Sequence, residues 1–311
     1  MTAPSAARPR KPWAACLLSL LTPGLGHLYA GEWRAAIAAF LLFELACAAA
    51  GAFGVFAPWA PLNIPVMVAV PVAALAGVAY GAVRAARRAP RDSPRRAYDR
   101  WPVYAAVVLL AAFVTQQYTA LLRRDVVRAF RLPSRSMQPT LLAGDFLFVR
   151  PIVRPAAVVR GEIVVHKSLT EEGVFVIKRV AGTPGDTLQM IGGRLAVNGA
   201  PEATRIGPGG DVSSDVSDPG MNWQRRFLVS GVDSAAYRPS RDNWGPIVVP
   251  PDACFVLGDN RDNAYDSRYW GFLPAGMIFG RPVRIYLSSY PDSPRSFLAA
   301  VRWDRIGRAV R

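Results

Sequence analysis

Two serines lie in a short polar loop ahead of an apolar run, and their setting could support chemistry. The loop occupies residues 133–141 and reads PSRSMQPTL, with Ser134 and Ser136 between Pro133 and Pro139. Each proline fixes its own φ angle and pushes the preceding residue towards extended geometry, so such a loop has few conformations to lose. It could therefore hold a hydroxyl in one orientation.

A serine hydroxyl becomes a good nucleophile only when a neighbouring base takes its proton. The sequence has two histidines, His27 and His166, and neither serine lies in a Gly-x-Ser-x-Gly turn, which argues against a histidine-based triad. Lysine is the other candidate base, and it is scarce. It occurs only at Lys11, Lys167 and Lys178.

Lys178 is the base that the sequence favours. It lies in the strand-like run 174–180 (VFVIKRV), where alternation places it on the same face as Val176 and Val180. An ammonium among valines is desolvated, which lowers its pKa and allows it to act as a neutral base. Lys167 precedes a polar turn with two glutamates and is expected to be solvated. The alternative for the pair is an edge-strand lysine beside a serine that only caps a turn.

A late block at 258–274 reads GDNRDNAYDSRYWGFLP. With this block, the chain resembles the bacterial type I signal peptidases (leader peptidases, S26 family), which are Ser/Lys proteases of the membrane surface. The resemblance covers roughly residues 130–290. It rests on four blocks in the family's order: the serine loop, 160–165 (RGEIVV), 177–186 (IKRVAGTPGD) and the GDNR start of the late block.

The resemblance implies roles for individual residues. Ser136 would be the nucleophile and Lys178 the general base, and the Ser136 backbone N–H with the Ser134 hydroxyl would form the oxyanion hole. The residues that it implies as supports of the site are Met137, Arg179 in an ion pair with Asp259, Asp266, and Arg268.

One position departs from the family pattern. The usual serine in the Asn-Ser-x-Asp part of the late block, which hydrogen-bonds the catalytic lysine, is Ala264 here. Lys178 is therefore expected to be oriented by packing or by another hydroxyl. The sequence has no metal-ligand spacing, and neither a metal nor a cofactor is expected.

The same resemblance implies a substrate and a fold. The substrate would be the signal peptide of an exported preprotein, bound as an added strand with small residues before the scissile bond. Short β-branched and aromatic runs after residue 130 predict a mainly β, barrel-like domain, and the resemblance implies that this is a catalytic domain with the signal-peptidase fold. The predicted strands are 146–149, 162–166, 174–180, 194–198, 226–229, 254–257 and 282–287, with a variable insertion at about 187–252.

Five aromatic residues near these blocks have two interpretations. They could form an apolar surface that rests in the bilayer near the cleavage site, or they could belong to the barrel core. They are Phe146, Phe148, Tyr269, Trp270 and Phe272.

The first part of the chain has the pattern of a membrane protein. The net charge is +15, and basic clusters lie beside long apolar runs, which indicates the cytoplasmic face of a membrane rather than nucleic acid. Glu44 lies inside one such run, and its partner cannot be identified from the sequence. The predicted parts are a basic N-terminus with an interfacial or re-entrant segment (1–34), a transmembrane hairpin (35–83), an Arg-rich cytoplasmic loop (84–100), a transmembrane helix (101–122) and an extracytoplasmic peptidase domain (123–311).

This arrangement predicts a multi-pass protein of the bacterial inner membrane with its catalytic domain on the periplasmic side. Its expected partners are signal peptides and membrane lipid, and nucleic acid is not expected. Two other functions remain open. One is a catalytically impaired membrane homologue that acts as a scaffold, and the other is a self-cleaving protein of the soluble Ser/Lys type, which the apolar spans disfavour.

Overall fold

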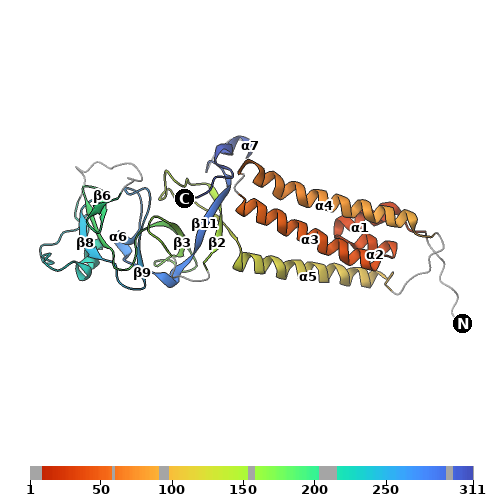
Figure 1. Ribbon diagram of the computed structural model, residues 1–311, viewed down its shortest axis with the longest axis horizontal. Helices are drawn as coiled ribbons and strands as arrows, with labels where there is room; N and C mark the ends of the chain where they lie inside the picture. Colours follow the sequence, from red (N-terminus) through yellow and green to blue (C-terminus); the bar gives the residue numbers. More distant parts are fainter. Residues whose placement is uncertain are drawn as a thin grey trace. The chain divides into compact units, whose positions relative to one another are not determined.

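The computed structural model describes residues 9–57, 60–90, 98–152, 158–202, 216–291 and 297–310 (Figure 1). By internal contacts the chain divides into two units, residues 1–123 and 124–311. The first unit is helical and the second is mainly β.

Long apolar helices dominate the first unit. In the part that the structure describes, three are long and apolar enough to cross a membrane, since about 20 apolar residues suffice. They are α3 (Trp33–Phe56), α4 (Ala60–Arg88) and α5 (Trp101–Asp125). α4 stays helical through Pro65 and Pro71 and continues to Arg88, so the start of the expected 84–100 loop is helical. Residues 91–97 of that loop lie outside the described residues.

Two short helices precede them, α1 (Pro12–Leu21) and α2 (Leu25–Ala30). With 10 and 6 residues, neither is long enough to cross a bilayer. The turn between them requires glycine. Gly24 has a φ of +91°, and a Cβ there would overlap the carbonyl oxygen of Ala36 in α3. The turn therefore packs closely against α3.

The carboxyl group inside α3 has a partner on α5. Thr115 Oγ1 donates a hydrogen bond of 2.9 Å to Glu44 Oε1. Near the other end of these two helices, Tyr98 Oη donates to the Gly31 carbonyl oxygen at 3.2 Å. Both contacts hold α5 beside α3, and the first gives the Glu44 carboxyl group a hydrogen-bond partner within the helical unit.

The second unit is built from antiparallel strands. They are β1 (Arg128–Arg131), β2 (Asp145–Pro151), β3 (Ile163–Lys167), β4 (Phe175–Gly182), β5 (Thr187–Ile191), β6 (Arg194–Val197), β7 (Ala200–Pro201), β8 (Trp244–Val248), β9 (Ala253–Leu257), β10 (Leu273–Pro274) and β11 (Ile278–Ser288). Short helices lie between or after them: η3 (Pro219–Phe227), α6 (Ser267–Trp270), η4 (Ala275–Met277), α7 (Phe297–Ala300) and η5 (Trp303–Arg305).

These strands form two sheets among the described residues. The larger has the order β1-β2-β11-β3-β4-β9-β10, and the smaller has the order β7-β6-β5-β8. The larger sheet joins the strand after the serine loop, β2, to the strand that carries Lys178, β4, by way of β11 and β3. The strands β2, β11 and β3 are labelled in Figure 1. The smaller sheet occupies the predicted insertion. The prediction of a mainly β catalytic domain after N-terminal helices is confirmed.

One predicted strand and the placement of five aromatic side chains in this domain can be compared with the structure. The predicted strand at 226–229 is wrong: η3 continues to Phe227, and Leu228 makes only an isolated bridge to Ile247. Tyr269, Trp270 and Phe272 pack on buried clusters of the interior, in agreement with the core interpretation. Phe146 and Phe148 are half-buried and pack against Tyr286 on the face of β2 opposite the buried Leu147 and Val149, so these two lie outside the core and the surface interpretation stays a prediction for them.

Candidate active site

The serine loop is tied at its base and anchored in the core. Where the loop meets β2, Leu132 N donates to the Asp145 carbonyl oxygen at 2.8 Å, and Gly144 N donates back to the Leu132 carbonyl oxygen at 2.8 Å. Within the loop, Met137 and Leu141 are 0% and 1% exposed and belong to one hydrophobic cluster. Burial of these two side chains fixes the backbone on either side of the turn.

Lys178 reaches this loop from the middle of β4. Its neighbour across the strand pair is Val164 of β3, and Val164 packs in a cluster with Val180. The predicted apolar face of Lys178 is therefore present. Its side chain is 2% exposed, and Nζ lies 2.9 Å from Ser136 Oγ.

Burial lowers the pKa of Lys178 below the ordinary lysine value, and the positive charge of Arg268 lowers it further. The carboxylates of Asp266 and Asp259 act in the opposite direction. The net lowering makes the neutral amine accessible at a lower pH than for a solvated lysine. Lys167, in contrast, is exposed at the end of β3, as predicted.

The second serine of the loop lies beside the first. Ser134 Oγ is 3.1 Å from Ser136 Oγ, and Ser134 is exposed whereas Ser136 is 9% exposed. The late block touches the same loop through its backbone. Asn260 N donates to the Ser136 carbonyl oxygen at 3.0 Å, and Asn260 Nδ2 donates to the Arg135 carbonyl oxygen at 3.3 Å.

The ion pair expected between Arg179 and Asp259 is present. Arg179 Nε and Nη2 donate to the two carboxylate oxygens of Asp259 at 2.8 and 2.7 Å, and Nη1 donates to the Gly161 carbonyl oxygen at 2.7 Å. Asp259 is fully buried. This pair links β4 to the start of the late block and so sets the position of Asn260.

A second ion pair shapes the late block from within. Arg268 donates to Asp266 from Nε and Nη2 at 2.8 and 2.9 Å, and both side chains are fully buried. Asp266 also accepts from the Gly258 backbone N–H at 3.0 Å, while Arg268 Nη2 donates to the Arg261 carbonyl oxygen at 2.8 Å. The block therefore folds back on itself around this pair.

Sequence comparison identifies the group of proteins to which this site belongs. The family described as "Signal peptidase, peptidase S26" matches residues 101–287, which is more than half of the chain. The chain belongs to this signal peptidase family. Membership makes it a serine endopeptidase.

Two relatives with known names agree with this assignment. A protein named signal peptidase I from Leptolyngbya laminosa is 35% identical over 172 residues, which cover 52% of this chain and 70% of the relative. A signal peptidase I from Pseudomonas aeruginosa is 31% identical over 216 residues, covering 60% and 72%. The crystal structure of a signal peptidase I from Enterococcus faecalis V583 is 27% identical and matches with a TM-score of 0.26, covering 40% of this chain and 95% of that one.

Ala264, the departure from the signal peptidase pattern, lies beside the serine loop. A Cβ built on Gly258 would overlap Ala264 Cβ and would lie 2.6 Å from the Ser136 carbonyl oxygen. Residue 264 therefore adjoins the backbone of Ser136. Within the described residues, the hydroxyl that lies 3.1 Å from Ser136 Oγ is that of Ser134.

Asp145, a fully buried carboxylate at the base of the serine loop, is a supporting residue that could not be recognised from sequence alone. Arg305 donates to it from Nε and Nη2 at 3.1 and 2.6 Å, and also from Nη2 to the Thr140 carbonyl oxygen at 3.0 Å. Ser288 Oγ donates to the same carboxylate at 2.6 Å. Because Arg305 lies 160 positions after Asp145, no local pattern could have indicated the pair.

His166 is a second buried titratable group on the face of β3 that Val164 shares. It is 1% exposed; Nδ1 is 2.8 Å from the Lys167 carbonyl oxygen, and Nε2 has no partner among the described residues. Burial lowers the pKa of His166 to about 4. The hydroxyl of Ser136 hydrogen-bonds Lys178 and Ser134 rather than this imidazole.

Proposed function

We propose that this chain removes signal peptides from exported preproteins, with Ser136 as nucleophile and Lys178 as general base. The observation that carries the proposal is the contact of 2.9 Å between Lys178 Nζ and Ser136 Oγ, made by two buried side chains. Family membership supports the substrate class, because the relatives described above bear the name signal peptidase I.

The reaction begins with neutral Lys178. It takes the proton from Ser136 Oγ as this oxygen attacks the scissile carbonyl carbon, and it then gives the proton to the leaving amine. The Ser134 hydroxyl and the Ser136 backbone N–H stabilise the negative charge that develops on the carbonyl oxygen. Water then hydrolyses the acyl-enzyme through the same base.

The supporting residues act on this dyad through contacts. Arg179 and Asp259 fix the backbone that donates to the Ser136 carbonyl oxygen, and the pair of Asp266 and Arg268 shapes the rest of the late block. Met137 anchors the loop by its burial. The dyad needs no metal or cofactor, because the base is a side chain of the protein.

The membrane arrangement belongs to the same proposal. Arg84, Arg87 and Arg88 lie in the last turns of α4, and Arg100 precedes α5, so the positive-inside rule assigns this region to the cytoplasm. α5 then crosses outward and delivers the peptidase domain to the extracytoplasmic side. Protease added to spheroplasts should cleave after residue 130 and spare residues 84–100. Cleavage confined to 84–100 would show the opposite orientation.

A scaffold function has one observation in its favour, the missing serine at Ala264. Purified full-length chain in detergent separates the two functions, with a preprotein that carries an Ala-x-Ala site as substrate. Ser136→Ala and Lys178→Met should each reduce cleavage at least about a thousandfold, as is usual for loss of a nucleophile or its base. Lys167→Met is the matched control, because it removes the exposed lysine of the neighbouring strand. Equal loss from Lys167→Met, or no cleavage by the unmodified chain, would argue against the proposal.

The pH dependence of kcat/KM provides a second measure of the base. The acid limb reports deprotonation of Lys178, whose pKa lies below the ordinary value of 10.5. We therefore expect cleavage to increase with pH through a midpoint below 10.5. A midpoint at or above 10.5 would mean that burial does not make this lysine a base.

A further inference from the structure

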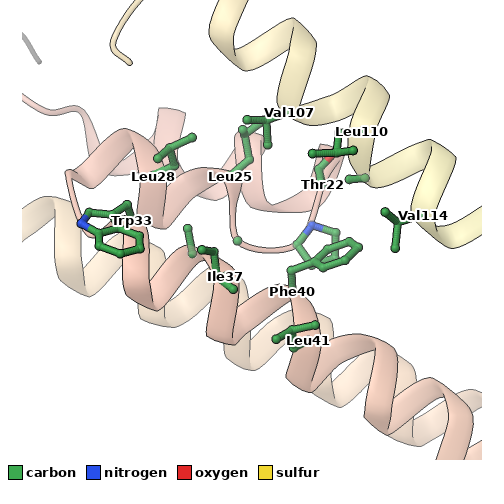
Figure 2. A pocket seen from close by; sticks show the side chains of 14 residues that line it. Thr22, Leu25, Leu28, Trp33, Ile37, Phe40, Leu41, Val107, Leu110 and Val114 are labelled. Atoms are coloured by element: carbon green, nitrogen blue, oxygen red, sulfur yellow. The ribbon is translucent and has the colours of Figure 1, made fainter. Parts of the chain in front are cut away.

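An apolar cavity of about 340 Å³ lies within the helical unit, among residues that the peptidase mechanism does not use (Figure 2). Three segments line it: the turn from α1 into α2, the first half of α3, and the middle of α5. Large apolar side chains from all three segments line it, among them Leu25, Leu28, Ile37, Phe40, Leu110 and Val114. Two of these three segments lie before residue 101, outside the family match.

The cavity exists because α5 packs loosely against α3. No residue of α5 is buried, whereas the turn at Gly24 is pressed against the backbone of Ala36. The hydrogen bond from Thr115 to Glu44 ties the two helices together next to Val114, which lines the cavity. The contact of Tyr98 with Gly31 ties them again near the start of both helices. The cavity lies between these two hydrogen bonds and is open to a bound molecule.

The size and chemistry of the space favour a slender apolar chain. A cavity of about 340 Å³ is near the lower end of ligand sites, which favours a small occupant such as a single hydrocarbon chain. Because the surrounding helices are apolar enough to cross a membrane, the medium at the mouth of the cavity is hydrocarbon.

Positive charge lies at one end of the cavity. Trp33, the first residue of α3, lines it, and the Arg34 guanidinium carbon is 5.2 Å from the centroid of the Trp33 ring. Arg100 follows Tyr98 by two residues, and the Tyr98 hydroxyl donates to the carbonyl oxygen of Gly31 just before this end of α3. The ion pair that the described parts of the helical unit contain joins Arg10 to Asp99 and involves neither Arg34 nor Arg100. Signal peptides begin with a basic region, which these charges would repel, whereas a lipid phosphate would be attracted.

We propose that the cavity binds one acyl chain of an anionic phospholipid, with its phosphate held by Arg34 and Arg100. The lipid fills the space between α3 and α5 and so stabilises α5, the helix that leads into the peptidase domain. The proposal rests on the membrane-spanning arrangement proposed above, but not on peptidase activity.

The test uses delipidated full-length chain in detergent, to which phosphatidylglycerol or phosphatidylcholine is added. Native mass spectrometry counts retained lipid, and thermal unfolding reports its effect on stability. We expect phosphatidylglycerol to bind at least about tenfold more tightly than phosphatidylcholine. Arg34→Gln and Arg100→Gln should each weaken phosphatidylglycerol binding about fivefold, since each removes one cation near the membrane surface. Arg84→Gln in α4 removes the same charge away from the cavity and should change little.

A pair of variants on α5 tests the cavity itself. Ala111→Phe places a ring in the cavity and should abolish retention of phosphatidylglycerol, whereas Ala112→Phe adds the same ring at a neighbouring residue that does not line it. Ala111→Leu serves as a smaller filler if the phenylalanine variant does not fold. Equal binding of the two lipids, or full retention of phosphatidylglycerol by both fillers, would overturn the proposal. So would displacement of the lipid by a signal peptide with a basic start, which would make the cavity a peptide site. Peptidase activity is not a readout here, so failure of this proposal leaves the proposed function untouched.

Discussion

Removal of Arg179 should destabilise the peptidase domain more than removal of any exposed arginine. Asp259, its partner, is 0% exposed and receives two hydrogen bonds of 2.8 and 2.7 Å from the guanidinium. Arg179→Met leaves this carboxylate buried without a counter-charge. It also removes the donor to the Gly161 carbonyl oxygen.

The loss in free energy of unfolding that Arg179→Met causes can be estimated from the burial of the ion pair. Breaking a buried ion pair by removing one partner typically costs about 3–5 kcal/mol. For a unit that spans residues 124–311, about 1 kcal/mol moves the unfolding temperature by about 2–4 °C, so Arg179→Met should lower Tm by about 6–20 °C. Arg281 and Glu162 form a pair at 2.9 Å whose side chains are 25% and 30% exposed. Arg281→Met should therefore cost no more than about 1 kcal/mol.

A double-mutant cycle decides whether the buried charge is the cause. Arg179→Met with Asp259→Leu replaces both partners by apolar groups, and it should recover most of the stability lost in the single variants. Thermal unfolding of the full-length chain in detergent, followed by near-ultraviolet circular dichroism, measures each variant. Equal Tm shifts for Arg179→Met and Arg281→Met, or a double variant that loses the sum of the two single losses, would refute the reasoning.

Two further predictions follow from the site. Ala264→Ser restores the family's usual hydroxyl beside the serine loop. Because one neutral hydrogen bond contributes about 1 kcal/mol, this change should raise kcat/KM by no more than about tenfold and move the acid limb of the pH profile to higher pH. An unchanged rate and an unchanged pH profile would show that residue 264 does not touch Lys178. The pKa of His166 is lowered to about 4 in the folded chain, against 6.5 in the unfolded chain. Between these two pH values the unfolded chain binds more protons than the folded one. The free energy of unfolding should therefore fall as pH decreases from 6.5 towards 4, by about 3 kcal/mol at most. His166→Phe should flatten that dependence in denaturant unfolding, and an unchanged slope would mean that another group titrates.

The serine loop and its lysine could be found from sequence because each is encoded locally. Two prolines and two serines define the loop, and strand alternation places Lys178 among valines. The long helices could also be predicted, since apolar length alone determines them, although their ends differ from the predicted bounds by up to five residues. Patterns of this kind depend only on neighbours in the chain.

Elements that depend on distant contacts could not be predicted in this way. The run 226–229 has the composition of a strand, but Asp218 caps a 3₁₀ helix that buries Met221 and Gln224 and continues to Phe227. β8 lies in a stretch rich in turn residues, and it becomes a strand because β5 pairs with it. Tertiary pairing overrides local propensity in both cases.

The chemical state of Lys178 also depends on distant contacts, and it explains the composition of the late block. Asp259 and Asp266 both raise the pKa of this lysine, and by themselves they would favour its protonated, inactive form. Each carboxylate instead binds an arginine at two points, Asp259 with Arg179 and Asp266 with Arg268. Pairing weakens the field of each carboxylate at Lys178, so that burial sets the direction of the shift. Two aspartates can therefore shape the backbone around Lys178 while this proposed base keeps its lowered pKa.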